Sequence, residues 1–422
     1  MRLLLDGNDW LLAPLLPHEF WWRQAWKEEW SPAGCPPWGE WIRACVPGDV
    51  IADTLDAGLI PHPYIDLNSL ACEWLSERDW VYRKHFTAPD EWRGKHVRLR
   101  FDGVDYACEV YLNERLLGRH EGTFTPFEFD VSEHLRFEKP NCLTVLVEHK
   151  PPVDVVQGQI GWTSRARVWK SRFAYDWDWC TRLVPLGIWQ SVALLATEGV
   201  WSEDVWVRPR VQGNVAQVEV SARLRSVPSA LDGWNLQWRV EDPDGNLVVQ
   251  RETPVQPGDT APSEQVVTLE IPQPRLWYPN GMGEQPLYRL RLYLVRGERC
   301  SDEREVTFGI RTVRAVPNEG APPDALPYTL EVNGRRVFVK GWNWTPHEQM
   351  TGRVRPERYE RLLTLAKHAH CNLLRVWGGG LLEREQFYAL CDRLGIMVWQ
   401  EFPHSSSGIQ NAPPEDAEYL QY

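Results

Sequence analysis

Short runs that alternate hydrophobic and polar residues fill the first part of the chain. Residues 97–101 and 109–112 are two examples, and polar turns separate such runs between about residues 40 and 197. Strict alternation over four to eight residues is typical of a strand with one buried face. Residues 1–198 are therefore predicted to form an antiparallel β-sandwich of jelly-roll type.

A second alternating region follows the first. Residues 217–220, 236–240 and 290–293 show the same period of two, and Asp244 followed by Gly245 predicts a hairpin turn. About a hundred residues of this kind fit an immunoglobulin-like module. Residues 199–316 are therefore predicted to be a second β-sandwich.

The hydrophobic period changes beyond that point. Residues 317–327, rich in Pro and Ala, are predicted to be a linker or crossing segment, and residues 337–341 are predicted to be a strand. Amphipathic helices are predicted at residues 356–370 and 383–394, because their apolar residues recur at helical spacing.

Each predicted helix leads into an apolar run, at residues 372–377 and 396–402. Strand, helix, strand, helix, strand is the opening of a parallel α/β barrel. Residues 317–422 are therefore predicted to hold the first part of a (β/α)8 TIM barrel, about three of its eight strands. The fold class is multidomain, β plus α/β, and we expect the barrel's active site to be left unfinished by this polypeptide.

Composition and charge limit the classes of partner that the chain is expected to bind. The chain has 43% hydrophobic and 25% charged residues and a formal net charge of -12, which argues against nucleic acid and anionic membrane as partners. Asp6 and Asp9 interrupt the apolar start, so we expect no signal peptide, and no run is long enough to span a membrane. Nine cysteines without CxxC spacing favour reduced thiols and a cytoplasmic location.

Glu401 is the carboxylate best placed for chemistry by pattern alone, because it follows the third predicted barrel strand. Cleavage of a glycosidic bond uses two carboxyl groups that face each other across the anomeric carbon. Glu401 is a candidate for one of them. The alternative is a supporting residue that only hydrogen-bonds its neighbours.

Arg375 and Trp377 are expected on one side of the second barrel strand, at its carboxyl end. An Arg there can orient a carboxylate, and the indole of a Trp can form the floor of a sugar subsite. The alternative is an ion pair and a packed indole that hold the barrel together.

Asp176, Trp177, Asp178 and Trp179 form a third candidate. A carboxylate between indoles can accept hydrogen bonds from a sugar diol while a ring stacks on the sugar, and the chain's 24 tryptophans favour a carbohydrate ligand. A surface turn with two anchoring tryptophans is the alternative.

Neither a metal nor a cofactor is expected. His368 and His370 are two apart on a predicted helix and point in different directions. The three glycines at residues 378–380 lack the spacing and Lys of a phosphate loop, so they predict a tight turn near the active face.

A series of motifs occurs in order along the chain, at residues 46–50, 57–63, 79–83, 110–113, 177–179, 187–189, 276–281, 308–312, 340–344 and 374–380. Together they resemble glycoside hydrolase family 2, and within it the β-mannosidase branch. The resemblance runs over nearly the whole chain.

The resemblance implies an exo-acting enzyme that removes terminal β-mannosyl residues with retention of configuration, so the expected ligand is a β-mannoside or related oligosaccharide. Trp177 and Asp178 would reach the sugar subsite, together with Asn343, Arg375 and Trp377 from the barrel. The family's acid/base and nucleophile follow the fourth and seventh barrel strands, positions this chain does not contain. Glu401 would then support the substrate site only, and a homodimer is left open.

Two segments depart from the β-mannosidase pattern. Cys180 and Thr181 follow Trp179 where Gly and Pro are common, and residues 405–408 lack the aromatic, Cys-containing loop of that branch. Alternative activities are those of an exo-β-glucosaminidase or a β-galactosidase. A different class of answer is a non-catalytic carbohydrate-binding protein.

Overall fold

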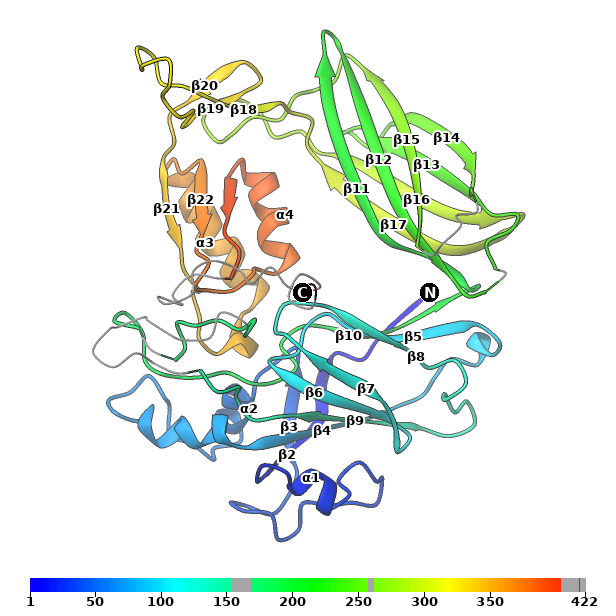
Figure 1. Cartoon of the computed structure of the whole chain (residues 1–422), viewed down its shortest axis with the longest axis vertical. Coiled ribbons are helices and arrows are strands. Elements are labelled where there is room, and N and C mark those ends of the chain that lie inside the picture. Colours follow the sequence, from blue (N-terminus) through cyan, green and yellow to red (C-terminus); the bar gives the residue numbers. More distant parts are fainter. Residues whose placement is uncertain (154–167, 176, 229, 257–261, 404–416, 418–422) are drawn as a thin grey trace.

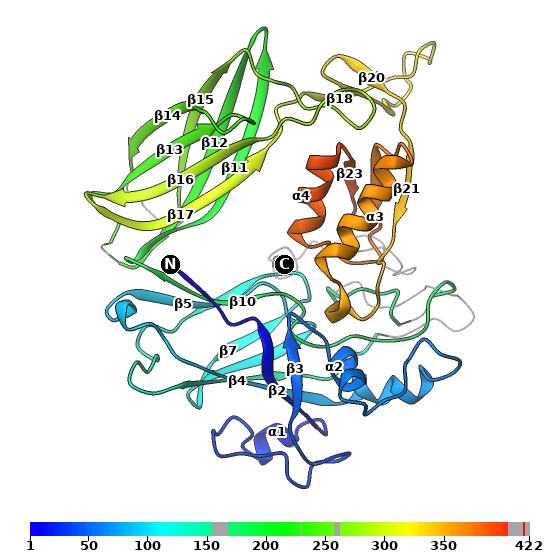
Figure 2. The same ribbon diagram turned by 180° about the vertical axis from the view of Figure 1, so that it is seen from behind.

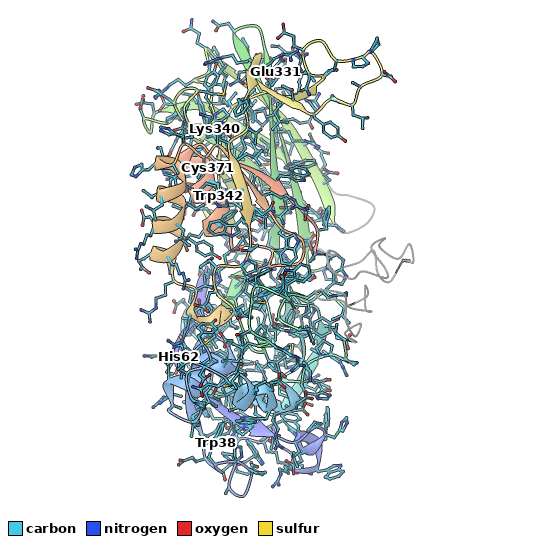
Figure 3. The ribbon with its side chains drawn as sticks, turned by 90° about the vertical axis from the view of Figure 1, so that its left-hand side faces the viewer. Trp38, His62, Glu331, Lys340, Trp342 and Cys371 are labelled. Atoms are coloured by element: carbon cyan, nitrogen blue, oxygen red, sulfur yellow. The ribbon has the colours of Figure 1, made fainter. Side chains whose placement is uncertain are left out.

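Three bodies with different hydrophobic patterns follow one another along the chain. The computed structural model describes residues 1–153, 168–175, 177–228, 230–256, 262–403 and 417. A first β-sandwich lies at one end of the molecule, and a small parallel α/β unit and a second β-sandwich lie side by side above it (Figures 1 and 2). Figure 3 labels Trp38 in the first sandwich, Trp342 in the α/β unit and Glu331 at the far end.

The first sandwich packs a six-stranded antiparallel sheet against a four-stranded one. The six-stranded sheet has the order β3 (Ile42–Val46), β2 (Gly7–Leu15), β4 (Asp79–Phe86), β9 (Asn141–Val147), β6 (Ala107–Leu112), β7 (Arg115–Glu121). The four-stranded sheet has the order β1 (Arg2–Leu4), β10 (Val192–Thr197), β5 (His96–Phe101), β8 (Phe127–Asp130). Its helices are α1 (Glu19–Trp22), α2 (Val50–Asp56), η1 (Leu70–Glu77) and η2 (Asp90–Trp92). The predicted sandwich is confirmed.

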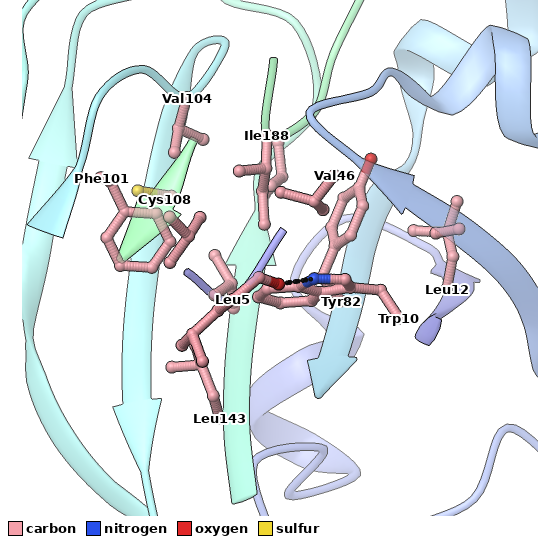
Figure 4. Packing of buried hydrophobic residues seen from close by; sticks show 14 of the residues in the cluster. Leu5, Trp10, Leu12, Val46, Tyr82, Phe101, Val104, Cys108, Leu143 and Ile188 are labelled. Atoms are coloured by element: carbon pink, nitrogen blue, oxygen red, sulfur yellow. Dashed lines mark hydrogen bonds between the residues drawn. The ribbon is translucent and has the colours of Figure 1, made fainter. Parts of the chain in front are cut away.

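Two buried indoles anchor the core of the first sandwich. Trp10 donates from Nε1 to the carbonyl of Leu5 at 2.8 Å, as Figure 4 shows, and Trp80 donates to the carbonyl of Leu75 at 2.9 Å. Both rings are fully buried. Because their polar N–H groups are satisfied, these large side chains contribute apolar burial without leaving an unpaired donor.

The second sandwich consists of a three-stranded and a four-stranded antiparallel sheet, as in immunoglobulin-like modules. The strands are β11 (Val200–Gln212), β12 (Val215–Ser226) and β15 (Ser263–Pro272) in one sheet, and β14 (Leu247–Pro254), β13 (Asn235–Glu241), β16 (Tyr288–Arg296) and β17 (Arg299–Phe308) in the other. Every second residue of β15 is buried, which places one face of that strand in the core. Gly245, at φ +87°, lies in the predicted hairpin between β13 and β14.

The segment predicted as a linker is a hairpin loop. It joins β18 (Val313–Val316) to β19 (Thr329–Val332), and β20 (Arg335–Val337) completes a small antiparallel sheet. Residues 317–327 themselves form no helix or strand, as expected of a connecting segment, and the pairing comes from the two short segments on either side of them.

The α/β unit has three parallel strands, β21 (Gly341–Trp344), β22 (Leu373–Val376) and β23 (Met397–Gln400). Helix α3 (Pro356–His368), preceded by η3 (Thr351–Arg353), and helix α4 (Glu385–Leu394) connect them. Leu374 and Val376 pack against Leu363 and Phe387 of these helices. The fold class is therefore two β-sandwiches followed by the opening strands of a TIM-type barrel.

The strand predicted at residues 337–341 is wrong. β20 ends at Val337 and β21 begins at Gly341, so the predicted strand joins the end of one sheet to the start of another. The side-chain amide of Asn372 binds the intervening segment: its Oδ1 accepts from the Lys340 N–H at 2.8 Å and its Nδ2 donates to the Phe338 carbonyl at 3.0 Å. Alternation alone does not show where one sheet ends and the next begins.

The second sandwich binds the carbonyl ends of the two helices. Asn280 donates from Nδ2 to the carbonyls of Lys367 and Cys371 at 2.9 and 3.0 Å, and from its backbone N–H to the carbonyl of Gly395 at 2.7 Å. Trp277 Nε1 donates to the carbonyl of Asp392 at 2.7 Å. The last carbonyls of a helix have no partner within it, so these bonds both cap the helices and join two domains.

No helix among the described residues has both the length and the hydrophobicity that crossing a membrane requires.

Replacing Gly395 tests this junction. An added Cβ would lie 2.7 Å from the Asn280 nitrogen, at φ +76°, whereas Gly334 has φ +74° and nothing within 4 Å of its Cβ position. We expect Gly395→Ala to lower the free energy of unfolding by about 1–3 kcal/mol more than Gly334→Ala, because both introduce backbone strain but only the first introduces a clash. Urea unfolding of the two variants measures this, and equal losses would contradict it.

Candidate functional site

Polar and aromatic side chains lie in a row across the sheet face of the α/β unit that the helices leave uncovered. Asn343, Arg375 and Trp399 are register partners on β21, β22 and β23. Side chains two residues apart share a face of a strand, so Trp377 and Glu401 continue this face at the carboxyl edge. Strand pairing thus brings together four of the predicted site residues, Asn343, Arg375, Trp377 and Glu401.

Arg375 is the centre of a hydrogen-bond network at this edge. Its Nε and Nη2 lie 2.7 and 2.5 Å from Oε1 of Glu401, and its Nη1 donates to Oδ1 of Asn343 at 3.0 Å. The Gly378 N–H donates to Oε2 of Glu401 at 2.9 Å. Both Glu401 oxygens are therefore engaged, which suits a carboxylate that positions its neighbours.

The glycines after β22 form the tight turn that the sequence predicts. The Gly380 N–H donates to the carbonyl of Trp377 at 3.1 Å. A Cβ on Gly379 would lie 2.2 Å from the Trp377 ring, and one on Gly378 would lie 2.3 Å from the carbonyl oxygen of Phe402. Only glycine fits here, and the turn sets the position of the Trp377 indole.

A loop of the first sandwich packs onto this turn. The Phe173 N–H donates to the carbonyl of Gly379 at 3.4 Å, and Ser171 Oγ donates to the carbonyl of Gly380 at 2.9 Å. These bonds join residues about two hundred positions apart in the sequence. The loop is therefore fixed to the barrel edge by its backbone as well as its side chains.

The same loop brings two indoles to Trp377. The ring centroids of Trp177 and Trp377 are 5.0 Å apart, and those of Trp179 and Trp377 are 6.1 Å apart. Trp179 also stacks on Phe173 at 5.4 Å. Asp178 lies between the two indoles in sequence and is exposed. Asp176 and the loop at residues 405–408 lie outside the described residues.

An open cavity of about 850 Å³ runs along the uncovered sheet face. Asn343, Arg375, Trp342 and Trp399 are among the residues that line it, and the Arg375 guanidinium lies 5.8 Å from the centroid of the Trp399 ring. Cavities of this size that combine aromatic walls with a few polar groups are typical of small-molecule sites. Among the described residues, no three His, Cys, Asp or Glu side chains are grouped as metal ligands.

Sequence reasoning missed the residues that hold the site together. Gln349 donates from Nε2 to the carbonyl of Thr181 at 2.5 Å, which fixes the loop that carries Trp177 and Asp178. Arg384 donates to the carbonyls of Trp189 and Thr351 at 2.8 and 3.1 Å. No local signal marks these side chains, because each bond joins distant segments.

Asp49 is the exception, since an Asp directly before an apolar run indicates a helix N-cap. Its Oδ1 accepts from the Ala52 N–H at 2.8 Å at the start of α2. Its Oδ2 accepts from the Gly352 N–H at 2.5 Å, in η3 between β21 and α3. One carboxylate therefore caps a helix and joins the first sandwich to the barrel unit.

Burial raises the pKa of two carboxyl groups at this junction. The pKa of Asp49 is raised to about 6 and that of Asp53 to about 8, in both cases chiefly because burial disfavours the charged form. Burial also lowers the pKa of His347 to about 4. His347 therefore stays neutral at pH 7, beside the Trp344 and Tyr359 rings.

Family profiles match both β-sandwiches of the chain. A family profile described as glycosyl hydrolase 2 galactose-binding domain-like matches residues 22–190, and one described as glycosyl hydrolases family 2 matches residues 202–311. The chain belongs to glycoside hydrolase family 2.

Within the family, the chain is β-mannosidase-like. Beta-mannosidase B of Emericella nidulans is 28% identical over 380 residues, which cover 85% of this chain and 43% of that protein. Beta-mannosidase of Rattus norvegicus is 30% identical over 398 residues, 88% of this chain and 44% of that protein. The chain thus spans less than half the length of these relatives.

Solved structures agree with this fold. The crystal structure of beta-D-mannosidase from Dictyoglomus thermophilum has a TM-score of 0.81 and 31% identity, and covers 100% of this chain and 49% of that chain. Beta-glucuronidase 2 of Bacteroides uniformis has a TM-score of 0.68 at 19% identity, covers 96% of this chain and 42% of that chain, and shows the fold alone.

The buried carboxyl groups predict a pH dependence of stability. Asp53 has its usual pKa near 3.8 when unfolded and about 8 when folded, so the folded state binds more protons between these values and stability falls as the pH rises from about 4 to 8. Asp53→Asn should remove part of this slope, because the amide cannot ionise, and should gain relative stability at pH 8.

Asp66→Asn is the control for Asp53→Asn, because Asp66 lies in the segment after α2 and is exposed. Urea unfolding at pH 5 and pH 8 measures the slope. Asp66→Asn should keep the slope of the parent chain, and an unchanged slope in Asp53→Asn as well would contradict the raised pKa of Asp53.

Proposed function

We propose that the protein to which this chain belongs is a retaining exo-β-glycosidase that removes terminal β-D-mannosyl residues. The observation that carries the proposal is the contact of Trp177 with Trp377, at 5.0 Å between ring centroids. It brings a loop of the first sandwich to the carboxyl edge of the barrel strands, which is where barrels of this type hold substrate. The β-mannosidases among the relatives support the choice of sugar.

The chemistry of this edge suits a sugar ring. Indoles at Trp177 and Trp377 offer flat faces for the apolar C–H side of a pyranose, and the exposed Asp178 carboxylate can accept hydrogen bonds from a diol. Asn343 and Arg375 contribute amide and guanidinium groups from the sheet face. A ring stacked between the loop and the barrel would therefore meet both apolar and polar partners.

Glu401 has a supporting role in this proposal. Its oxygens accept from Arg375 and from the Gly378 N–H, so it fixes the guanidinium and the glycine turn. Retention requires two carboxyl groups about 5 Å apart across the anomeric carbon. We infer that these lie in further strands of the barrel, and that residues 1–422 alone are inactive.

Two other activities are also candidates, because the loop after Trp179 departs from the β-mannosidase pattern. Cys180 donates from Sγ to the carbonyl of Phe173 at 3.4 Å, so its side chain helps to shape the turn after Trp179. A changed turn could admit a different terminal sugar, which keeps exo-β-glucosaminidase and β-galactosidase activity as the second candidates. Cytoplasmic location and a homodimer stay predictions.

Hydrolysis of a panel of aryl β-glycosides tests the activity. We expect residues 1–422 to be inactive and a version extended to the end of its reading frame to be active, with the highest kcat/KM on the β-mannoside. Greater activity on another glycoside would change the proposed sugar. Activity of residues 1–422 alone would instead make Glu401 a catalytic candidate.

Replacing Asp178 tests the subsite. In the extended protein, Asp178→Ala should lower kcat/KM about 30- to 1000-fold, because loss of a hydrogen bond to the transition state costs about 2–4 kcal/mol. Asp324→Ala removes an exposed carboxylate from the β18–β19 loop and should leave kcat/KM unchanged. Equal kcat/KM for both variants would show that Asp178 does not bind the substrate.

A further inference from the structure

A second aromatic cavity lies on the first sandwich, away from the barrel edge. Pro37, Trp38, Leu59, Trp74 and Arg78 line it, and its volume is about 520 Å³. Figure 3 labels Trp38 toward the end of the molecule opposite Lys340, well separated from Trp342. The lining residues come from the loop before β3, the segment after α2, and η1 with the residue that follows it.

Two indoles form a corner in this cavity. The ring centroids of Trp38 and Trp74 are 6.0 Å apart and their planes are inclined at 71°. Both side chains are partly exposed. A corner of this kind offers one aromatic face and one aromatic edge to the same ligand.

A third indole holds the corner rigid from below. Trp80 is fully buried, and its ring centroid lies 6.1 Å from that of Trp38 and 6.2 Å from that of Trp74. Trp38 Nε1 donates to the carbonyl of Glu40 at 2.9 Å, which fixes its orientation. The surface is therefore formed before any ligand arrives, so a ligand would lose little affinity to ordering of the protein.

Arg78 supplies the polar side of the cavity. Its Nη1 is buried and has no hydrogen-bond acceptor among the residues that the structure describes, whereas the residue as a whole is only half-buried. The guanidinium therefore keeps hydrogen-bonding capacity that the described protein groups do not use. A guanidinium offers five N–H donors in a plane, which can serve the hydroxyl oxygens of a ligand.

We propose that Trp38, Trp74 and Arg78 form a second carbohydrate-binding site for a hexopyranose unit of an oligosaccharide, separate from the barrel edge. A pyranose has an apolar C–H face to stack on an indole and hydroxyl groups at its rim to accept from Arg78. The cavity volume lies in the range of small-molecule sites and leaves room for one or two sugar rings. The proposal rests on the proposed function only for the choice of sugar.

Calorimetric titration of residues 1–422 with β-1,4-mannobiose tests the site. The Trp177→Ala background removes the barrel-edge subsite, so the remaining binding reports on this cavity. We expect saturable binding in that background, about tenfold weaker after Trp74→Ala and weaker after Arg78→Gln, because stacking and the guanidinium donors are lost in turn.

Trp22→Ala is the matched control, because Trp22 lies outside the cavity with an exposed fraction of 85%. It should leave the affinity unchanged. Arg78→Gln keeps the indole cluster intact, so it remains informative if Trp74→Ala disturbs the fold, which thermal unfolding would reveal.

Three results would overturn the proposal: no mannobiose binding in the Trp177→Ala background, equal affinity with and without Arg78→Gln, or displacement of the disaccharide by inorganic phosphate. The last would indicate an anion site. These results are distinct from failure of the proposed function, which is judged by hydrolysis of aryl glycosides in the extended protein.

Discussion

The Asp49 carboxylate and the Gly352 amide meet where the first sandwich touches the barrel unit, 2.5 Å apart. A Cβ on Gly352 would lie 2.5 Å from the Asp49 nitrogen, so the two backbones can approach this closely only because the residue is glycine. The contact of Gly395 with Asn280 follows the same rule, because a Cβ there would lie 2.7 Å from the Asn280 nitrogen. Close backbone contact at glycines therefore determines how the three bodies sit together.

This mode of contact concentrates buried polar groups at the junctions. Asp49 and Asp53 are buried near the first sandwich's contact with the barrel unit, and burial raises the pKa of both. The neutral form of each group is the one that folding favours, so the free energy of unfolding falls as the pH rises. Domain contact and proton binding are therefore linked through the same carboxyl groups.

At the carboxyl edge of the barrel strands, contacts between the bodies bring polar and aromatic side chains together. The network of Arg375, Glu401 and Asn343 gives the sheet face a fixed pattern of charge, and the turn after β22 fixes Trp377 beneath the first-sandwich loop. Each element alone is a strand end or a loop. Together they place aromatic rings and polar groups at one edge of the sheet, beside the cavity that Asn343, Arg375 and Trp399 line, and sugar recognition needs this combination of groups.

Much of the fold could be read from the sequence because it depends on local patterns. Alternation of period two predicted the strands of both sandwiches, and helical spacing predicted α3 and α4 to within two residues at each end. The start of β21 was misplaced, because residues 337–341 are apolar enough to continue a strand and only the Asn372 side chain shows that they do not.

The sequence by itself determined which residues end the barrel strands and therefore share a face, as with Arg375 and Trp377, because side-chain direction in a strand follows from position alone. Only the tertiary structure decided that Trp177 packs on Trp377, that Gln349 binds the loop after Asp178, and that Glu401 is held by Arg375. These contacts join segments that are 26 to 200 positions apart in the chain. Their energy depends on distance in space, and the periodicity of the sequence carries no information about that distance.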